Sequence, residues 1–300
     1  MSVSERTRSD GRPAWLPHRE YPFESRFLEL EGDRIHYIDE GTGPVLLFVH
    51  AGPSWSFVFR GVVARLRDRF RCVSLDFPGS GLSPAAPGSE VTLASASRVL
   101  ERFVKALDLR NVTLVAHDIG GPVAIHAFAG MAERLRGFAV TGSFAWPMRE
   151  YPSIARMLRL VGGSVVGAID ATTNLIARST ARFGLGDLSR AGRAAYRGPF
   201  RDRRVRRNAR SMLGQAARSD AFLAGVQARV GETVGALPAL IVWGEKDPTR
   251  KQGWPARWEQ VLPRARSQVI HGARHFPQMN APEEVAALVE EWWKKEVAGG

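Results

Sequence analysis

The chain has a single cysteine, Cys72, among its 300 residues. One cysteine excludes an internal disulfide framework and suits a reducing compartment. Because Cys72 opens the apolar run CVSLD, we expect a buried strand residue there, not a thiol nucleophile.

Long uninterrupted apolar runs are also missing. Residues 1–15 lack the apolar core of a signal peptide. The most apolar long stretch, residues 157–177, is interrupted by Arg159 and Asp170. A membrane-spanning helix needs about 20 predominantly apolar residues. The sequence therefore predicts a cytoplasmic protein without a membrane partner.

Lysine is scarce, and nearly all of the basic residues behind the formal charge of +12 are arginines. They are densest in residues 190–210, RAGRAAYRGPFRDRRVRRNAR. Such a run is typical of a nucleic-acid surface or of a solvated helical face. No recognised nucleic-acid motif accompanies it, so we expect no nucleic-acid partner. No metal-ligand cluster, dinucleotide fingerprint or P-loop occurs either, and we therefore expect no metal and no cofactor.

Strand-like and helix-like patterns alternate along most of the chain. Residues 26–41 read as a hairpin. Apolar runs typical of strands buried on both faces follow at 45–50, 72–77, 111–117, 136–142, 239–244 and 266–271. Helical patterns lie at 57–69, at 92–108, from about 120, and at 281–295. This order predicts an α/β fold with a mostly parallel central sheet and flanking helices.

The alternation stops between residues 147 and 235, where the patterns are helical and no convincing strand occurs. We therefore predict a core domain made of residues 1–146 and 236–300. Residues 147–235 would form an inserted helical lid over the ends of the strands.

A sharp strand–turn–helix corner is indicated by Ala116-His117-Asp118-Ile119-Gly120. Its pattern is that of a nucleophile elbow, G-x-Nuc-x-G, with a carboxylate at the apex. The positive end of the following helix would favour an ionised Asp118 by roughly 0.3–1 kcal/mol. An N-cap is the alternative role for this residue.

Two further residues follow strand-like runs in the chain order of a nucleophile–acid–histidine triad. Asp247 lies in WGEKDP and His275 in HGARHFP. Asp247 would otherwise be a turn former, and His271 is an alternative histidine. Ligands of open α/β sheets bind at the carboxyl ends of the strands, where all three residues are expected to lie. No G-x-S-x-G motif competes with them.

The motifs together resemble the α/β-hydrolases of the haloalkane dehalogenase and epoxide hydrolase group. HAGPSWSFVFR, DFPGSGLS, VAHDIGG, SFAWP, AAYRGPF, WGEKDP and HFPQ all have counterparts in that group, most closely in dehalogenases with an Asp–Asp–His triad. The resemblance implies that Asp118 forms an ester with the substrate, and that His275, oriented by Asp247, activates the water that hydrolyses it. The N–H groups of Gly52 and Ile119 would form the oxyanion hole.

The resemblance also implies a pocket for a small-molecule substrate, and it leaves the oligomeric state open. The same motifs, with Tyr151 in the lid, supply the expected lining: His50, Pro53, Trp55, Trp146, Tyr151, Tyr196 and Pro199.

The sequence departs from the dehalogenases at the two side chains that hold the leaving halide. A tryptophan typically follows the nucleophile, but Ile119 stands here, and Gly52 stands where an asparagine is common. Compensating donors would be Trp55, Trp146 or a lid arginine. Two alternatives stay open: an epoxide hydrolase using the lid tyrosines, and a ligand-binding member of the fold with little or no catalysis.

Overall fold

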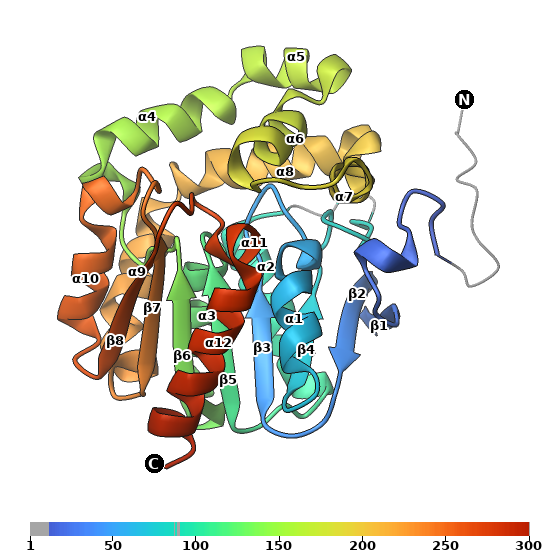
Figure 1. The fold of residues 1–300 in the computed structure, drawn as a ribbon. Coiled ribbons are helices and arrows are strands. Elements are labelled where there is room, and N and C mark those ends of the chain that lie inside the picture. Colours follow the sequence, from blue (N-terminus) through green and yellow to red (C-terminus); the bar gives the residue numbers. More distant parts are fainter. Residues whose placement is uncertain (1–11, 87, 89–90, 300) are drawn as a thin grey trace.

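A computed structural model of the protein describes residues 12–86, 88 and 91–299. The N-terminal segment behind the prediction of a cytoplasmic protein lies mostly outside these residues. An eight-stranded sheet forms the centre of the molecule, in the spatial order β1-β2-β4-β3-β5-β6-β7-β8 (Figure 1). Its strands are β1 (Arg26–Leu30), β2 (Asp33–Glu40), β3 (Val45–Val49), β4 (Arg71–Leu75), β5 (Val112–His117), β6 (Leu135–Thr141), β7 (Ala239–Gly244) and β8 (Ala265–Ile270).

The sheet begins with the expected hairpin and is otherwise mostly parallel. β1 pairs with β2, and β2 with β4, in antiparallel orientation, whereas all the other neighbouring strands are parallel. Glu31 and Gly32 connect β1 to β2 with φ angles of 50° and 91°. Two left-handed residues suit the twist of a two-residue hairpin turn. The mostly parallel sheet with flanking helices is the predicted fold class.

Two apolar cores lie on the two faces of the sheet, because successive side chains of a strand point to opposite faces. In β3, Leu47 and Val49 pack into one core, and Leu46 and Phe48 into the other. The first core is covered by α2 (Leu93–Ala106), α3 (Gly120–Phe128), α9 (Asp220–Val230) and α10 (Trp254–Val261). The second is covered by α1 (Arg60–Leu66), α11 (Pro277–Asn280) and α12 (Pro282–Trp292).

Between β6 and β7 the chain is helical and lies mostly above one end of the sheet (Figure 1). Besides α9, its α-helices are α4 (Pro152–Val161), α5 (Ser164–Thr173), α6 (Leu175–Ser179), α7 (Arg190–Arg197) and α8 (Arg203–Ala216). We refer to residues 152–230 as the lid. The link between α4 and α5 lies against α8, since a Cβ atom on Gly162 would come within 2.4 Å of the Gly214 Cα atom. No helix of the described residues is long and apolar enough to cross a membrane.

Candidate active site

Asp118 stands in the sharp turn between β5 and α3. Its φ angle of 49° is left-handed, which is uncommon for a residue with a side chain and marks a locally strained backbone. The turn is held by hydrogen bonds from the Asp118 N–H to the Thr141 oxygen (3.2 Å) and from the Ser143 hydroxyl to the Asp118 carbonyl (2.6 Å). A Cβ atom on Gly120 would lie only 2.4 Å from the Val49 oxygen. The corner therefore needs glycine at position 120.

Asp247 and His275 meet at the same edge of the sheet, after β7 and β8. The Nδ1 atom of His275 lies 2.9 Å from one carboxylate oxygen of Asp247. The other oxygen accepts from the N–H (2.9 Å) and the hydroxyl (2.8 Å) of Thr249. Asp247 is buried, and burial raises the pKa of its carboxyl, but His275 and Thr249 outweigh burial and lower it. An ionised Asp247 can therefore orient the imidazole and stabilise its protonated form.

The charges of Asp118 and His275 depend on each other. Burial raises the pKa of Asp118 to about 6, although His275 and the hydrogen bond from the Ile119 N–H oppose this rise. Burial lowers the pKa of His275, but the carboxylates of Asp247 and Asp118 outweigh burial and raise it to about 9. At neutral pH the site therefore holds an ionised Asp118 beside a protonated His275.

A second histidine, His117, forms part of the wall around His275. Its ring centroid lies 4.9 Å from that of His275, and its Nδ1 N–H donates to the Thr141 oxygen (2.9 Å). Burial and the neighbouring His275 hold the pKa of His117 well below its usual value. His117 is therefore neutral and adds no competing charge to the site.

A cavity of about 200 Å³ joins the elbow to the lid. Asp118 and His275 both line it, and so do Gly52 and Ile119. The rest of the lining is almost wholly apolar: Pro53, Phe144, Ile154, Met157, Leu158, Thr180, Leu213, Ala216, Thr249, Trp254 and Phe276. Such a lining suits a small apolar substrate with one reactive bond near Asp118.

The cavity offers few side-chain donors for a leaving group. Thr180 donates to the Ile176 oxygen, and Thr249 donates to Asp247. Trp254 differs, because its indole N–H is buried without a hydrogen-bond partner among the described residues. Apart from His275, it is the one lining side chain whose N–H or O–H is uncommitted.

The two tryptophans predicted as halide donors lie elsewhere. The Trp55 indole donates to the Tyr196 carbonyl (3.1 Å), so its N–H is already used. Trp146 is buried, with no partner for its N–H among the described residues, but it does not line the cavity. The ring centroid of Trp146 lies 5.1 Å from that of Trp258, and the Cζ atom of Arg257 lies over the Trp146 ring, 4.5 Å from its centroid.

Most of the other residues predicted for the pocket have structural contacts instead. The Tyr196 hydroxyl donates to the Pro53 carbonyl (2.6 Å), and the Tyr151 hydroxyl accepts from Arg257 (3.1 Å). Neither tyrosine lines the cavity, nor does the buried Pro199. Of the predicted lining residues, only Pro53 does so.

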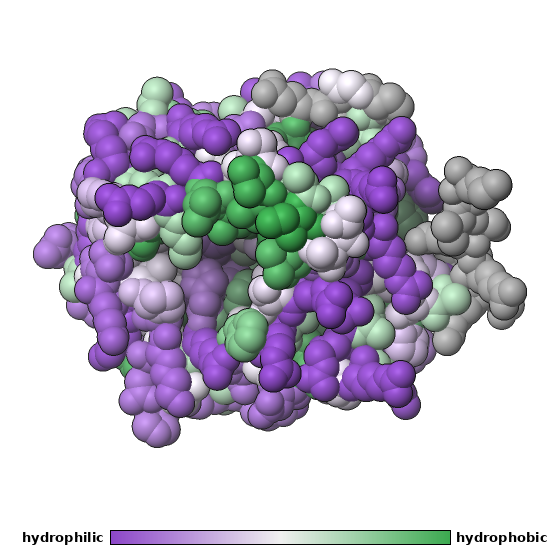
Figure 2. All heavy atoms as spheres, turned by 90° about the horizontal axis from the view of Figure 1, so that it is seen from above, coloured by the Kyte–Doolittle hydropathy of each residue, from purple (hydrophilic) through white to green (hydrophobic). Residues whose placement is uncertain are grey.

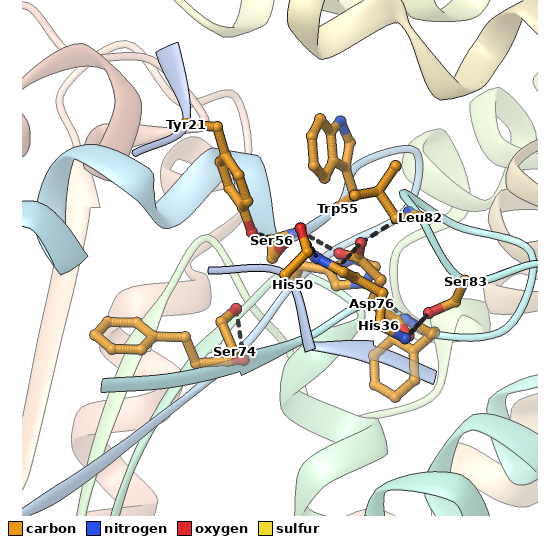
Figure 3. Close-up of polar contacts among 12 residues, drawn as sticks. Tyr21, His36, His50, Trp55, Ser56, Ser74, Asp76, Leu82 and Ser83 are labelled. Carbon is orange, nitrogen blue, oxygen red and sulfur yellow. Dashed lines mark hydrogen bonds and ion pairs between the residues drawn. The ribbon is translucent and has the colours of Figure 1, made fainter. Parts of the chain in front are cut away.

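His50 belongs to the polar network drawn in Figure 3, two residues before Gly52 in the chain. Its Nδ1 N–H donates to the Ala51 oxygen (2.7 Å) and its Nε2 accepts from the Phe77 N–H (3.1 Å). Burial lowers the pKa of His50, which keeps it neutral with both ring nitrogens occupied. Its contacts hold the backbone of the loop that carries Gly52, and His50 does not line the cavity.

Figure 3 also shows a second Asp–His pair, made by Asp76 and His36 at 2.8 Å. Asp76 accepts from the N–H groups of Ser56 (2.7 Å) and Leu82 (2.9 Å) as well, and both members are buried. Burial raises the pKa of Asp76, but His36 and the hydrogen bonds outweigh burial and lower it. This pair ties β2 to the segment after β4 and to the turn that carries Ser56, and neither member lines the cavity.

Of the residues that line the cavity, sequence reasoning named Gly52, Pro53, Asp118, Ile119 and His275. Among those that it passed over, Thr249 and Trp254 bear most directly on the chemistry. The run DPT is typical of a turn in which the aspartate side chain accepts a hydrogen bond from the backbone N–H two residues later, so the contact between Thr249 and Asp247 was predictable. Trp254 had no such signal, because its place in the cavity depends on how α10 packs. Among residues 12–86, 88 and 91–299, no group of three or more His, Cys, Asp or Glu side chains is arranged to hold a metal ion.

The order of the strands and the sharp corner at Asp118 are those of the α/β-hydrolase fold, and sequence comparison agrees. The chain belongs to the alpha/beta hydrolase fold family, whose model matches residues 44–282. It is a hydrolase similar to the haloalkane dehalogenases. It is 33% identical to haloalkane dehalogenase 2 of Mycobacterium bovis (strain ATCC BAA-935 / AF2122/97) over 272 residues, which cover 90% of this chain and 95% of that protein.

The chain is also similar to a decarboxylase and to a solved dehalogenase structure. The chain is 28% identical to the cis-3-alkyl-4-alkyloxetan-2-one decarboxylase of Shewanella oneidensis, over 90% of this chain and 88% of that protein. The crystal structure of haloalkane dehalogenase DbeA from Bradyrhizobium elkani matches with a TM-score of 0.79 at 22% identity, over 92% of this chain and 98% of that chain. This structural likeness concerns the fold alone.

Proposed function

We propose that the protein hydrolyses the bond between a saturated carbon and a leaving group in two steps, with Asp118 as the nucleophile. In the first step a carboxylate oxygen of Asp118 attacks the carbon, and the leaving group departs with the bonding electrons. The product is an alkyl ester on Asp118, and its carbonyl is what makes the second step possible. No cofactor is needed for either step.

In the second step His275 takes a proton from water, and the resulting hydroxide attacks the carbonyl carbon of the ester. The bond between that carbon and the alkyl oxygen then breaks, the alcohol leaves with the proton from His275, and the Asp118 carboxylate is regenerated. The N–H groups of Ile119 and Gly52 would stabilise the oxyanion, and the Ile119 N–H already lowers the pKa of the Asp118 carboxyl in the free enzyme. Esterification removes the Asp118 charge that helps to raise the pKa of His275. The pKa of His275 therefore falls below about 9 in the ester, where a neutral base is required.

The observation that carries this proposal is the shared cavity, into which Asp118 and the Asp247-bound His275 both open. The test is one panel of bromoalkanes, chloroalkanes, epoxides, alkyl oxetan-2-ones and activated esters assayed with purified protein. We expect turnover of at least one substrate with a reactive saturated carbon, and none above background with Asp118→Asn. Equal turnover by Asp118→Asn, or hydrolysis of activated esters alone, would contradict the proposal.

A substrate with a strained ring is a second candidate, and the missing halide donors favour it. Ring strain helps an oxygen leaving group to depart, so such a substrate depends less on side chains like those absent at positions 52 and 119. The Shewanella relative is named as acting on alkyl oxetan-2-ones, which contain a strained ring with a carboxylate-type leaving group. Faster turnover of oxetan-2-ones than of bromoalkanes in the panel would favour this candidate.

An epoxide hydrolase would need free tyrosine hydroxyls over the nucleophile. The Tyr196 hydroxyl instead donates to Pro53 inside the protein. We therefore expect Tyr196→Phe to leave epoxide and haloalkane turnover nearly unchanged and to lower the free energy of unfolding by about 1 kcal/mol. Denaturant unfolding and substrate assays with Tyr196→Phe and Tyr151→Phe measure both effects. A large loss of epoxide opening in both variants would restore the epoxide hydrolase alternative.

We further propose that the Trp254 side chain turns so that its indole N–H, which is buried in the free protein, contacts the leaving group in place of the missing donors. Trp254→Phe keeps an aromatic ring and removes the donor. A hydrogen bond to a charged group contributes about 1.5–3 kcal/mol, so kcat/KM for bromoalkanes should fall roughly 10- to 150-fold. Trp146→Phe is the matched control, because Trp146 is also buried with an unpartnered N–H but lies outside the cavity. Similar losses in both variants would mean that packing, not donation, explains the effect.

A further inference from the structure

The outer face of the lid carries an unusual concentration of exposed apolar side chains. Of the nine large hydrophobic residues exposed in the described chain, six lie between residues 157 and 183. Val165 is 71% exposed and Leu160 is 66% exposed, values typical of side chains with no protein neighbour. Viewed from above the lid, apolar side chains gather in the middle of this face and hydrophilic ones border them (Figure 2). The apolar patch consists of Met157, Leu160, Val165, Ile169, Leu175 and Phe183.

The charge of the lid is almost entirely positive. Residues 152–230 contain fifteen arginines, four aspartates and no lysine or glutamate, a net charge of +11 out of +12 for the whole chain. Two of the aspartates serve the lid itself: Asp170 accepts from the Ile176 N–H, and Asp202 caps α8. Among the described residues, the exposed arginines of the segment 156–207 form no ion pair. Their charge is therefore available to a partner.

Apolar and cationic side chains share one groove on this face. The groove has a volume of about 510 Å³. Ile169, Leu175 and Phe183 contribute apolar surface to it. Arg178, Arg182, Arg193 and Arg197 contribute guanidinium groups, against the single carboxylate of Asp187. An amphiphilic anion matches this combination, because guanidinium binds phosphate oxygens in a bidentate manner while the apolar side chains contact hydrocarbon.

We propose that the lid face docks on the surface of an anionic phospholipid bilayer. An apolar patch bordered by arginines is the arrangement by which a protein surface lies in a membrane interface, and each nearby basic residue strengthens binding to anionic lipid. A nucleic acid would give the apolar patch no partner. A second copy of the chain would bring two strongly positive faces together. Docking is an alternative to our sequence-based prediction of no membrane partner, which stays a prediction, and it does not rest on the proposed function.

Docking would bring the catalytic cavity close to the lipid. Met157 belongs to the apolar patch and also lines the cavity, together with Ile154 and Leu158 from the same helix. The α4 wall of the cavity would thus lie at the membrane surface. A lipophilic substrate dissolved in the bilayer would then reach Asp118 without crossing bulk water.

The test is co-sedimentation of the full chain with vesicles of phosphatidylcholine alone or mixed with phosphatidylglycerol. We expect binding only to the anionic vesicles, weakening as salt is added. Each basic residue near the surface contributes about 1 kcal/mol, roughly fivefold, so Arg178→Glu with Arg182→Glu should lower the partition coefficient about 25-fold or more. Leu160→Ser with Val165→Ser should also weaken binding. Far-UV circular dichroism and the midpoint of thermal unfolding show that each variant is folded.

The matched control is Lys294→Glu with Lys295→Glu, which makes the same change in net charge at the C-terminal end, far from the lid (Figure 1). It should keep most of the binding. Equal loss in this control, or no binding of the unaltered protein to anionic vesicles at low salt, would overturn the proposal. Full competition by a short RNA, together with unchanged vesicle binding by the Leu160→Ser, Val165→Ser variant, would also overturn the proposal. So would a dimer in solution that dissociates when these two residues are replaced. Inorganic phosphate should not compete with the vesicles, and complete competition would indicate a site for free phosphate instead.

Discussion

Replacing His275 with alanine should trap the protein as a covalent ester on Asp118. The first step of the proposed reaction needs only the carboxylate, whereas the second needs a base to activate water. General base catalysis contributes about 10²- to 10⁴-fold, so turnover should fall by that factor while the ester accumulates. Mass spectrometry of the digested protein should find the alkyl mass of the substrate on the peptide that contains Asp118.

The pH dependence of ester formation in this variant follows from the same charges. Only the ionised form of Asp118 attacks, so in the unaltered protein the rate of ester formation should rise as pH passes about 6. The positive charge of His275 lowers the pKa of Asp118. Without His275 that pKa lies higher, and the rise should move to a pH above about 6.

The controls separate the base from general damage to the site. His271→Ala changes a histidine that also follows β8 but is almost wholly exposed and pairs with Glu245, so turnover should stay unchanged. Asp118→Ala should yield no adduct. An adduct on another residue, or trapping by His271→Ala, would show that the triad has been assigned wrongly.

Restoring the two missing side-chain donors should raise bromoalkane turnover. The change is Ile119→Trp with Gly52→Asn, at two positions that line the cavity beside Asp118. Two hydrogen bonds to a departing halide would contribute about 3–6 kcal/mol, which sets a ceiling of roughly 10²- to 10⁴-fold in rate. The measurement is bromide release at equal concentrations of folded variant and unaltered protein.

The packing around positions 52 and 119 indicates how much of this increase in rate can be reached. A Cβ atom at position 52 would lie 3.4 Å from the Met212 Cγ atom and 3.7 Å from the Ile119 Cδ1 atom, which are ordinary contacts. The Cβ atom of an asparagine therefore fits there without displacing its neighbours. Tryptophan is much larger than the buried Ile119, and overpacking commonly costs about 1–3 kcal/mol. We expect a gain below the ceiling.

A matched control carries similar bulk without the donors: Ile119→Phe with Gly52→Ala. It should not accelerate bromide release. Equal acceleration in this control would mean that cavity shape limits the reaction. Rapid bromoalkane turnover by the unaltered protein, abolished by Trp254→Phe, would mean that Trp254 alone suffices and that the departures at positions 52 and 119 have little consequence.

Much of the site was predictable because a parallel sheet brings the carboxyl ends of its strands to one edge. Asp118, Asp247 and His275 were selected by chain order and by their places after apolar runs, and the structure has them after β5, β7 and β8. The Asp247–His275 contact follows from two adjacent parallel strands. The strands were also predictable, because alternating or continuous runs of apolar residues indicate strands and can be recognised in the local sequence.

The sequence by itself thus determined the sheet, the corner at Asp118 and the absence of side-chain donors at positions 52 and 119. Only the tertiary structure decided the roles of the large polar aromatics. Trp55 and Tyr196 bond to backbone groups more than 140 residues away, and Trp254 is left without a partner. It also decided that Leu160 and Val165 face solvent. An apolar helical pattern predicts a buried face, but whether anything covers that face depends on contacts between segments far apart in the chain, and no local pattern encodes those contacts.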